Sequence, residues 1–150
     1  ALSLVLLSLP TLVAKAQSSI NLSVEGNTNY VIVVPSKPST VEDKAANVLK
    51  GYLKEISGAD FKIINDLEES SDFELLIGST NRNFKKTNHL KDDGFVVVSS
   101  KSKIQISGNG KGTLYGVYAF LETYLGCRKF AANMNELTTQ GIDKFNIIEP

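Results

Sequence analysis

The sequence predicts an α+β domain in which two amphipathic helices pack on a mixed, largely antiparallel sheet. Two stretches repeat apolar residues at spacings of three and four, as helices with one buried face do. Several short apolar segments bounded by Gly, Asn, Asp or Ser are typical of strands. Most consecutive strands lack the intervening helix that parallel neighbours usually need, which favours antiparallel pairing.

The composition is that of one ordinary globular domain. The chain has 150 residues, 42% of them hydrophobic, and a domain of this size buries about 70% of its unfolded surface. Its 16 Lys and Arg residues balance 16 Asp and Glu residues, so the formal net charge is zero. This balance provides no electrostatic attraction toward nucleic acid or an anionic membrane. We therefore expect a single core and no nucleic-acid partner.

The first residues have the pattern of an export signal. Residues 2–13 form an apolar run too short to cross a bilayer, and Ala14-Lys15-Ala16 matches the small-x-small cleavage pattern. A buried amphipathic helix is the alternative, but Pro10 and the lack of a polar face argue against it. We predict that residues 1–16 are a signal peptide truncated at its start. The mature protein would then be secreted or periplasmic, without a membrane span.

The domain itself is expected to cover residues 17–141. The apolar run Phe145–Ile148 falls within residues 142–150, which lie beyond it. Because Cys127 is the only cysteine, no internal disulfide can form and packing alone must stabilise the fold.

Two strands are expected near the start of the domain. Ile20, Leu22 and Val24 alternate with polar neighbours, which predicts a half-exposed strand that ends at Gly26-Asn27. The continuous apolar run Tyr30–Val34 predicts a buried strand.

A helix is predicted over residues 40–57. Ser39 and Glu42 have the spacing of a capping box, and Gly58 supplies a left-handed stop. Its apolar residues fall on one stripe: Val41, Ala45, Val48, Leu49, Tyr52, Leu53 and Ile56.

Four further strands and a second helix complete the domain. The strands are expected at 61–64, 73–77, 95–98 and 104–106, the last two forming a hairpin across 99–103. The helix follows the glycines at 108, 110 and 112 and ends at Gly126. Its apolar stripe is expected to be rich in aromatic residues and comprises Leu114, Val117, Tyr118, Leu121 and Leu125.

The glycine-rich turn Gly108–Thr113 has some features of a phosphate-binding loop. Exposed amides at a helix N-terminus can hold phosphate. However, Lys111 precedes Gly112 instead of following it, and Thr113 stands where a dinucleotide fingerprint needs glycine. We interpret the turn as a tight strand-to-helix connection, and a phosphate or nucleotide binder as the least favoured hypothesis.

No catalytic, cofactor or metal site is predicted. His89, the only histidine, lies in a polar segment typical of a surface loop, and Cys127 follows an apolar helix as a small buried hydrophobe would. The carboxylate groups occur in polar stretches without aromatic neighbours, which favours solvated turns over a glycosidase pair or a calcium loop. These groups are Asp92, Asp93, Asp66, Glu68, Glu69 and Asp72.

Several motifs together resemble a known module. They are Tyr30–Pro35, Leu53–Gly58, Leu75–Gly78, Asp93–Phe95, Ile104–Gly108 and, most specifically, Gly112–Glu122 followed by Leu125–Arg128. Over about residues 28 to 135 the chain resembles the N-terminal α/β accessory domain of α-glucuronidases, β-N-acetylhexosaminidases and related secreted bacterial glycoside hydrolases. The resemblance implies that the glycines and aromatic stripe build the fold, and that the catalytic carboxylates belong to a following (β/α)8 barrel. Residues 142–150 would then be the start of a linker or of this following catalytic domain.

Two functional hypotheses follow. The first is a non-catalytic accessory domain of a secreted, polysaccharide-degrading glycoside hydrolase, whose partner is the catalytic barrel of the same protein. The alternative is an independent carbohydrate- or protein-binding module, in which aromatic side chains would stack on a polysaccharide. Tyr30, Tyr115 and Tyr124 are the candidate binding residues.

Overall fold

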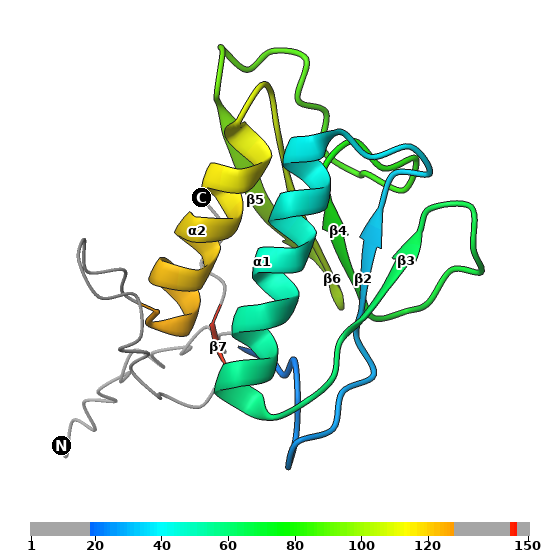
Figure 1. The fold of residues 1–150 in the computed structure, drawn as a ribbon, viewed down its shortest axis with the longest axis vertical. Helices are drawn as coiled ribbons and strands as arrows, with labels where there is room; N and C mark the ends of the chain where they lie inside the picture. Colours follow the sequence, from blue (N-terminus) through cyan, green and yellow to red (C-terminus); the bar gives the residue numbers. More distant parts are fainter. Residues whose placement is uncertain (1–18, 128–144, 147–150) are drawn as a thin grey trace, which may run out of the picture.

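The computed structural model describes residues 19–127 and 145–146 (Figure 1). The predicted signal peptide, and the predicted linker apart from 145–146, lie outside the described residues. The elements in order are β1 (Ser19–Ile20), β2 (Val31–Val34), α1 (Thr40–Ser57), β3 (Lys62–Asn65), β4 (Glu74–Ile77), β5 (Phe95–Ser100), β6 (Lys103–Gly108), α2 (Gly112–Leu125) and β7 (Phe145–Asn146).

The α+β class is confirmed, but the largely antiparallel sheet is not. The main sheet has the strand order β3-β2-β4-β6-β5, and its first four strands run parallel. The hairpin partner β5 is antiparallel to β6, as predicted. A separate antiparallel pair joins β1 to β7, with Ile20 opposite Phe145.

The expectation of antiparallel pairing was wrong because consecutive strands in this sheet are not always neighbours. The connection from β2 to its neighbour β3 does contain a helix, α1, as parallel crossovers usually do. By contrast, β3 and β4 are joined by a loop and lie on opposite sides of β2. Strand β5 runs antiparallel to the other strands and returns the chain to the edge where they begin, so that β6 can pair parallel with β4.

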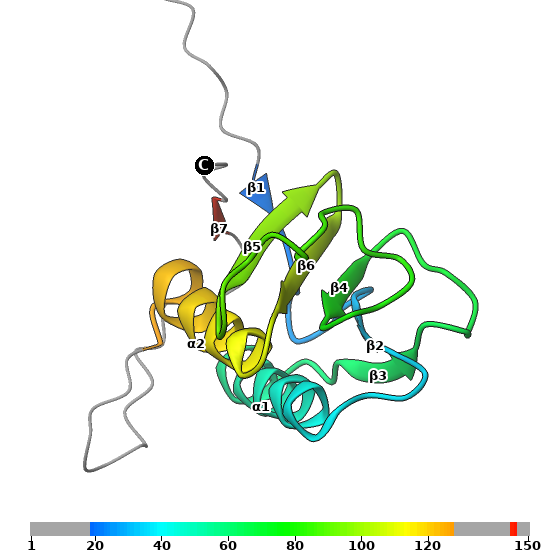
Figure 2. The ribbon, with the colours of Figure 1, turned by 90° about the horizontal axis from the view of Figure 1, so that it is seen from above.

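The two helices of the described chain lie side by side on one face of the main sheet (Figures 1 and 2). Between helices and sheet lies the main core, whose sheet residues include Ile32, Leu75, Ile77, Ile104 and Ile106. A smaller apolar cluster on the opposite face contains Val33, Ile64 and Leu76. The loops after β3 and β4 contact that face, so the central strands are buried on both sides.

Helix α1 has the predicted limits and the predicted caps. The Ser39 hydroxyl accepts a hydrogen bond from the Glu42 amide, and the Glu42 carboxylate accepts one from the Ser39 amide. Gly58 ends the helix in the left-handed conformation, with φ of 74°.

Helix α2 also has its predicted position, but Leu114 and Tyr118 of the predicted stripe are only half-buried. Gly116, Val117, Phe120 and Leu121 are buried, whereas Tyr115 is exposed. A Cβ on Gly116 would lie 2.8 Å from the Ile106 side chain, so this helix approaches the sheet at a glycine. Within the described residues, neither helix is long and apolar enough to cross a membrane.

The segment before β2 forms a tight turn instead of a continuous strand. β1 ends at Ile20, and Val24 and Asn27 exchange backbone hydrogen bonds of 2.9 and 3.0 Å. Glu25 and Gly26 between them both have positive φ, as a two-residue type I′ turn requires. Val24 is consequently exposed and does not join the core.

Candidate functional site

The natural place for a ligand in this fold is the carboxyl edge of the parallel strands. Open α/β sheets bind ligands where neighbouring strands connect in opposite directions. Here β2 connects through α1 to β3 on one side, whereas β4 lies on its other side. The carboxyl ends of β2 and β4 are therefore the candidate site.

The carboxylate of Glu42 lies at these strand ends. Besides its bond of 2.8 Å from the Ser39 amide, it accepts a bond of 2.7 Å from the amide of Ser79, just beyond β4. Gly78 makes room for it, because a Cβ there would lie 2.4 Å from Glu42 Oε1. The helix N-terminus, where an external anion would bind, is occupied by the chain's own carboxylate.

Asp66, directly after β3, connects the segments that follow β2 and β4. Its two oxygens accept hydrogen bonds of 2.9 Å from the Ser36 amide and 2.8 Å from the Asn81 amide. Its own amide donates to Val34 O at 2.9 Å. The carboxylate is buried, so the interpretation of Asp66 as part of a solvated acidic turn was wrong. Asp66 and Glu42 both hold backbone at the edge where a ligand would approach.

The glycine-rich turn before α2 is packed by its own chain. A Cβ on Gly112 would lie 2.1 Å from Gly94 O, and one on Gly108 would lie 2.4 Å from the same oxygen. Asp93 Oδ1 accepts a hydrogen bond of 2.7 Å from the Lys111 amide. These contacts favour the tight connection over a phosphate-binding loop.

A buried ion cluster lies on the loop-covered face. Glu74 receives bonds from Arg82 Nη1 at 2.5 Å, Lys103 Nζ at 2.8 Å and the Ser71 amide at 2.9 Å. Burial alone would raise the pKa of Glu74, but these hydrogen bonds and the two positive charges bring its pKa below the ordinary value. Arg82 also donates to Glu68 O, so the cluster joins the two loops that cover this face.

Gln105, buried at the centre of β6, anchors the loop after β4. Its carbonyl oxygen accepts bonds of 2.9 Å from the amides of Phe84 and Lys85. Its amide group donates to Lys85 O and to Ser107 Oγ, each at 2.7 Å. All four hydrogen-bonding positions of the side chain are therefore used.

Sequence reasoning did not single out Glu74 or Gln105. Each stands in an apolar strand, Phe73–Ile77 or Ile104–Ile106, where a lone polar residue must have a partner if it is buried. That interruption was the available signal, but it does not identify the partner.

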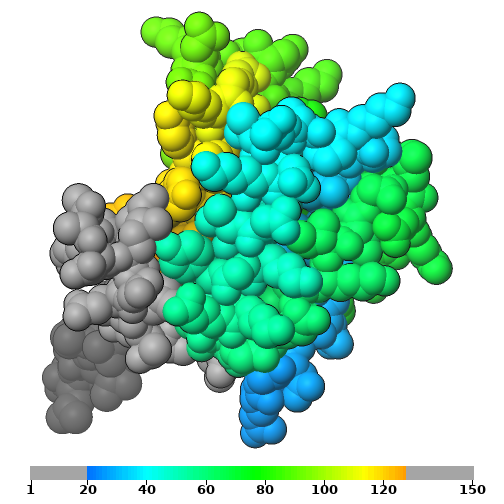
Figure 3. Space-filling model, viewed as in Figure 1, coloured from blue at the N-terminus to red at the C-terminus, as the bar shows by residue number. Residues whose placement is uncertain are grey.

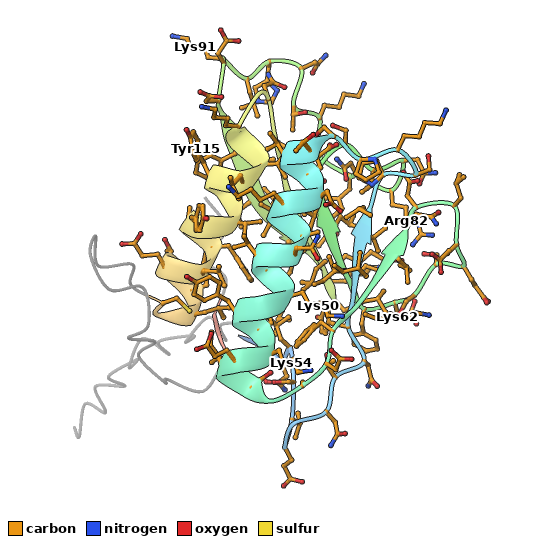
Figure 4. All side chains as sticks on the ribbon, viewed as in Figure 1. Lys50, Lys54, Lys62, Arg82, Lys91 and Tyr115 are labelled. Carbon is orange, nitrogen blue, oxygen red and sulfur yellow. The ribbon has the colours of Figure 1, made fainter. Side chains whose placement is uncertain are left out.

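The three candidate tyrosines do not form one site. Tyr30 is 3% exposed and its ring contacts Phe73, at a centroid distance of 5.4 Å. Tyr115 is 43% exposed on the outer side of α2 (Figure 4), and Tyr124 packs on Phe120 at 5.7 Å. With about 3.6 residues per turn, Tyr115 and Tyr124 lie on opposite faces of the helix.

The remaining candidate groups are dispersed. His89 is exposed in the loop after β4, and Cys127 is buried, where desolvation followed by the Glu55 charge raises the pKa of its thiol. Asp92, Glu68, Glu69 and Asp72 are exposed. Among the described residues, no group of three or more His, Cys, Asp or Glu side chains could hold a metal ion.

Hollows between described residues include the following two. One, of about 270 Å³, is open and lies among polar residues of the loop after β4, including Lys85 and Lys86. The other, of about 170 Å³, lies at the amino edge of the sheet and is lined by Tyr30 and Phe73. No protein-family model matches the chain, and comparison with curated proteins gives no match.

Proposed function

We propose that this chain is the non-catalytic N-terminal accessory domain of a secreted, polysaccharide-degrading glycoside hydrolase. Its partner is a catalytic (β/α)8 barrel of the same protein. The observation that carries the proposal lies at the carboxyl edge, where Glu42 and Asp66 each hold amides from two segments of backbone. A carboxylate engaged in this way supports the fold and is poorly placed to exchange protons with a substrate.

The stretch with the most specific family resemblance supports the same proposal. Its glycines are contact points between α2 and the β5–β6 hairpin with the turn before it, since side chains at Gly112 or Gly116 would collide with neighbouring atoms. The motif therefore has a packing role, which is the role that the family resemblance implies for it.

The face that we favour for docking on the barrel combines β5 with the adjoining side of α2. Phe95 is 38% exposed and Tyr115 is 43% exposed. The Phe95 ring lies close to α2 at Gly116, the residue after Tyr115, because its Cδ2 would lie 3.2 Å from a Cβ on that glycine. Strand β5 is at one edge of the main sheet, and no described strand pairs with its outer side. Edge strands and exposed aromatic residues are common parts of protein interfaces.

The test is to express the chain both alone and joined to the region encoded downstream of Pro150. We expect this region to be a barrel that packs on the domain and depends on it for stability. Because the two parts stabilise each other, the joined protein should unfold at a higher temperature than the chain alone. Tyr115→Asp should lower the unfolding temperature of the joined protein only. Phe84→Asp is the matched control, because Phe84 is 42% exposed in the loop after β4, away from this face. It should lower the unfolding temperature of neither protein. A downstream region without a barrel, or independent unfolding of the two parts, would overturn the proposal.

A further inference from the structure

The hollow at the amino edge of the sheet lies opposite the edge described above. It is formed by the segment 21–30, which projects at the lower end of the molecule (Figure 3), and by Phe73 at the start of β4. The amide of Val31 donates to Phe73 O at 3.1 Å, which joins these two parts of the wall. The volume is about 170 Å³, and a cavity of about 150 Å³ is large enough to hold one six-membered ring.

The hydroxyl of Tyr30 is the first group that points to a ligand. The residue is only 3% exposed, and its hydroxyl forms no hydrogen bond with any described residue. No buried side-chain oxygen of the described residues lacks a partner, so this hydroxyl is not fully buried and can be reached from the hollow. Desolvation raises the pKa of Tyr30 to about 12, so the group carries its proton at neutral pH and can donate it to a ligand oxygen.

Two exposed amide side chains, Asn21 and Asn29, add further donors and acceptors. Both line the hollow, and neither side chain bonds to a described residue. The backbone that carries them is held in place, because Thr28 Oγ1 donates to Leu22 O at 2.6 Å and accepts from the Tyr30 amide at 3.0 Å. A fixed arrangement of this kind lowers the entropic cost of binding.

Phe73 supplies an accessible aromatic ring. It is 39% exposed, and its edge-to-face contact with Tyr30, at an interplanar angle of 66°, fixes its orientation. The described residues that line the hollow carry no charge. It therefore combines neutral donors, neutral acceptors and one apolar ring face.

We propose that this amino-edge hollow binds a neutral saccharide unit, with the sugar ring against Phe73 and its hydroxyl groups bonded to Tyr30, Asn21 and Asn29. A sugar ring has both an apolar C–H face and a rim of hydroxyls, which matches this lining. A peptide would instead need backbone partners, whereas the Val24 and Asn27 amides already bond to each other's carbonyls. The binding does not depend on the accessory-domain proposal, since it requires no barrel.

The experiment is a ¹H–¹⁵N NMR titration of the full chain with cellohexaose, xylohexaose and mannohexaose. One of these should bind saturably and shift the amides of residues 21–31 and 73. Tyr30→Phe should weaken binding by about 5-fold, because it removes one hydrogen bond and keeps the ring. Phe73→Ala should weaken it by about 10-fold, whereas Phe84→Ala, which removes a similarly exposed ring elsewhere, should leave it unchanged.

Thermal unfolding of each variant shows whether it is folded, and Asn29→Ala replaces Phe73→Ala if that variant unfolds. Absence of saturable binding by all three hexasaccharides at millimolar concentration would overturn the inference. Equal affinity of the saccharide for the wild type, for Tyr30→Phe and for Phe73→Ala or its replacement Asn29→Ala would also overturn it. So would equally tight binding of a neutral hexapeptide in the same hollow. None of these results affects the unfolding test of the joined protein.

Discussion

The carboxylate of Glu42 accepts a hydrogen bond of 2.7 Å from the amide of Ser79, although the two residues are 37 positions apart in the sequence. The same group caps α1. A local capping motif thus also fixes the end of β4, at the edge where a sheet of this kind would bind a ligand.

Glu42→Ala should therefore cost more stability than the loss of a cap alone. Two charge-assisted hydrogen bonds disappear, and we expect a loss of about 2–3 kcal/mol in the free energy of unfolding. Urea denaturation measures it. Asp43→Ala, next to it in the first turn and also acidic, is the control and should cost less than about 1 kcal/mol. Equal effects of the two substitutions would contradict the described role of Glu42.

Glycines in the two helices should respond in opposite ways to replacement by alanine. At Gly112 the new Cβ would lie 2.1 Å from the backbone oxygen of Gly94, so we expect a loss of about 3 kcal/mol or more. At Gly51, in exposed helix, no atom lies within 4 Å of the new Cβ. Gly51→Ala should stabilise by about 0.5–1 kcal/mol. Thermal unfolding of both variants gives the comparison, and a stabilising Gly112→Ala would refute the close packing.

Glu74 should make the fold sensitive to acid. Its folded pKa is below the ordinary value, so the unfolded state takes up a proton more readily as the pH falls. The contribution is complete above the unfolded pKa, about 4.3, and is lost as the pH drops through the folded pKa.

Glu74→Gln should lower stability by about 3 kcal/mol at neutral pH, because it leaves Arg82 and Lys103 without their buried partner. The free energy of unfolding of the variant should also decrease less steeply than that of the wild type as the pH falls below about 4.3. Urea denaturation at a series of pH values measures both effects. An unchanged acid slope in the variant would show that other groups cause it.

Gln105→Leu should loosen the loop after β4 with little change elsewhere. The amides of Phe84 and Lys85 lose their acceptor, so their hydrogen exchange should accelerate by at least about 10-fold. Amides of α1 serve as the internal reference. If the Phe84 and Lys85 amides exchanged at wild-type rates, the loop would be held by other contacts.

The helices could be predicted because their determinants are local. Ser39, Glu42 and Gly58 lie within or next to the segment that they delimit, and the structure gives the predicted limits for α1. The direction of strand pairing depends instead on which segments become neighbours. Residues 66–73 give no local sign that they carry the chain past β2, and this is why the mostly parallel sheet was missed.

For the polar groups of the candidate site, too, the local contacts could be predicted from the sequence and the long-range contacts could not. Glu42 was recognised as a cap, but its contact with Ser79 depends on the folded position of β4. Asp66 looked like one member of an acidic loop, and its burial arises only when Ser36 and Asn81 converge on it. Likewise, the hollow at Tyr30 requires Phe73, which belongs to a distant segment.

The most direct measurement of the central claim, that this chain has a structural and not a catalytic role, is a hydrolysis assay. The purified chain is incubated with a panel of 4-nitrophenyl glycosides at pH values across the acidic and neutral range. We expect no release of 4-nitrophenol above the rate in buffer. Turnover by the wild-type chain that is abolished in folded Glu42→Gln or Asp66→Asn protein would contradict the account.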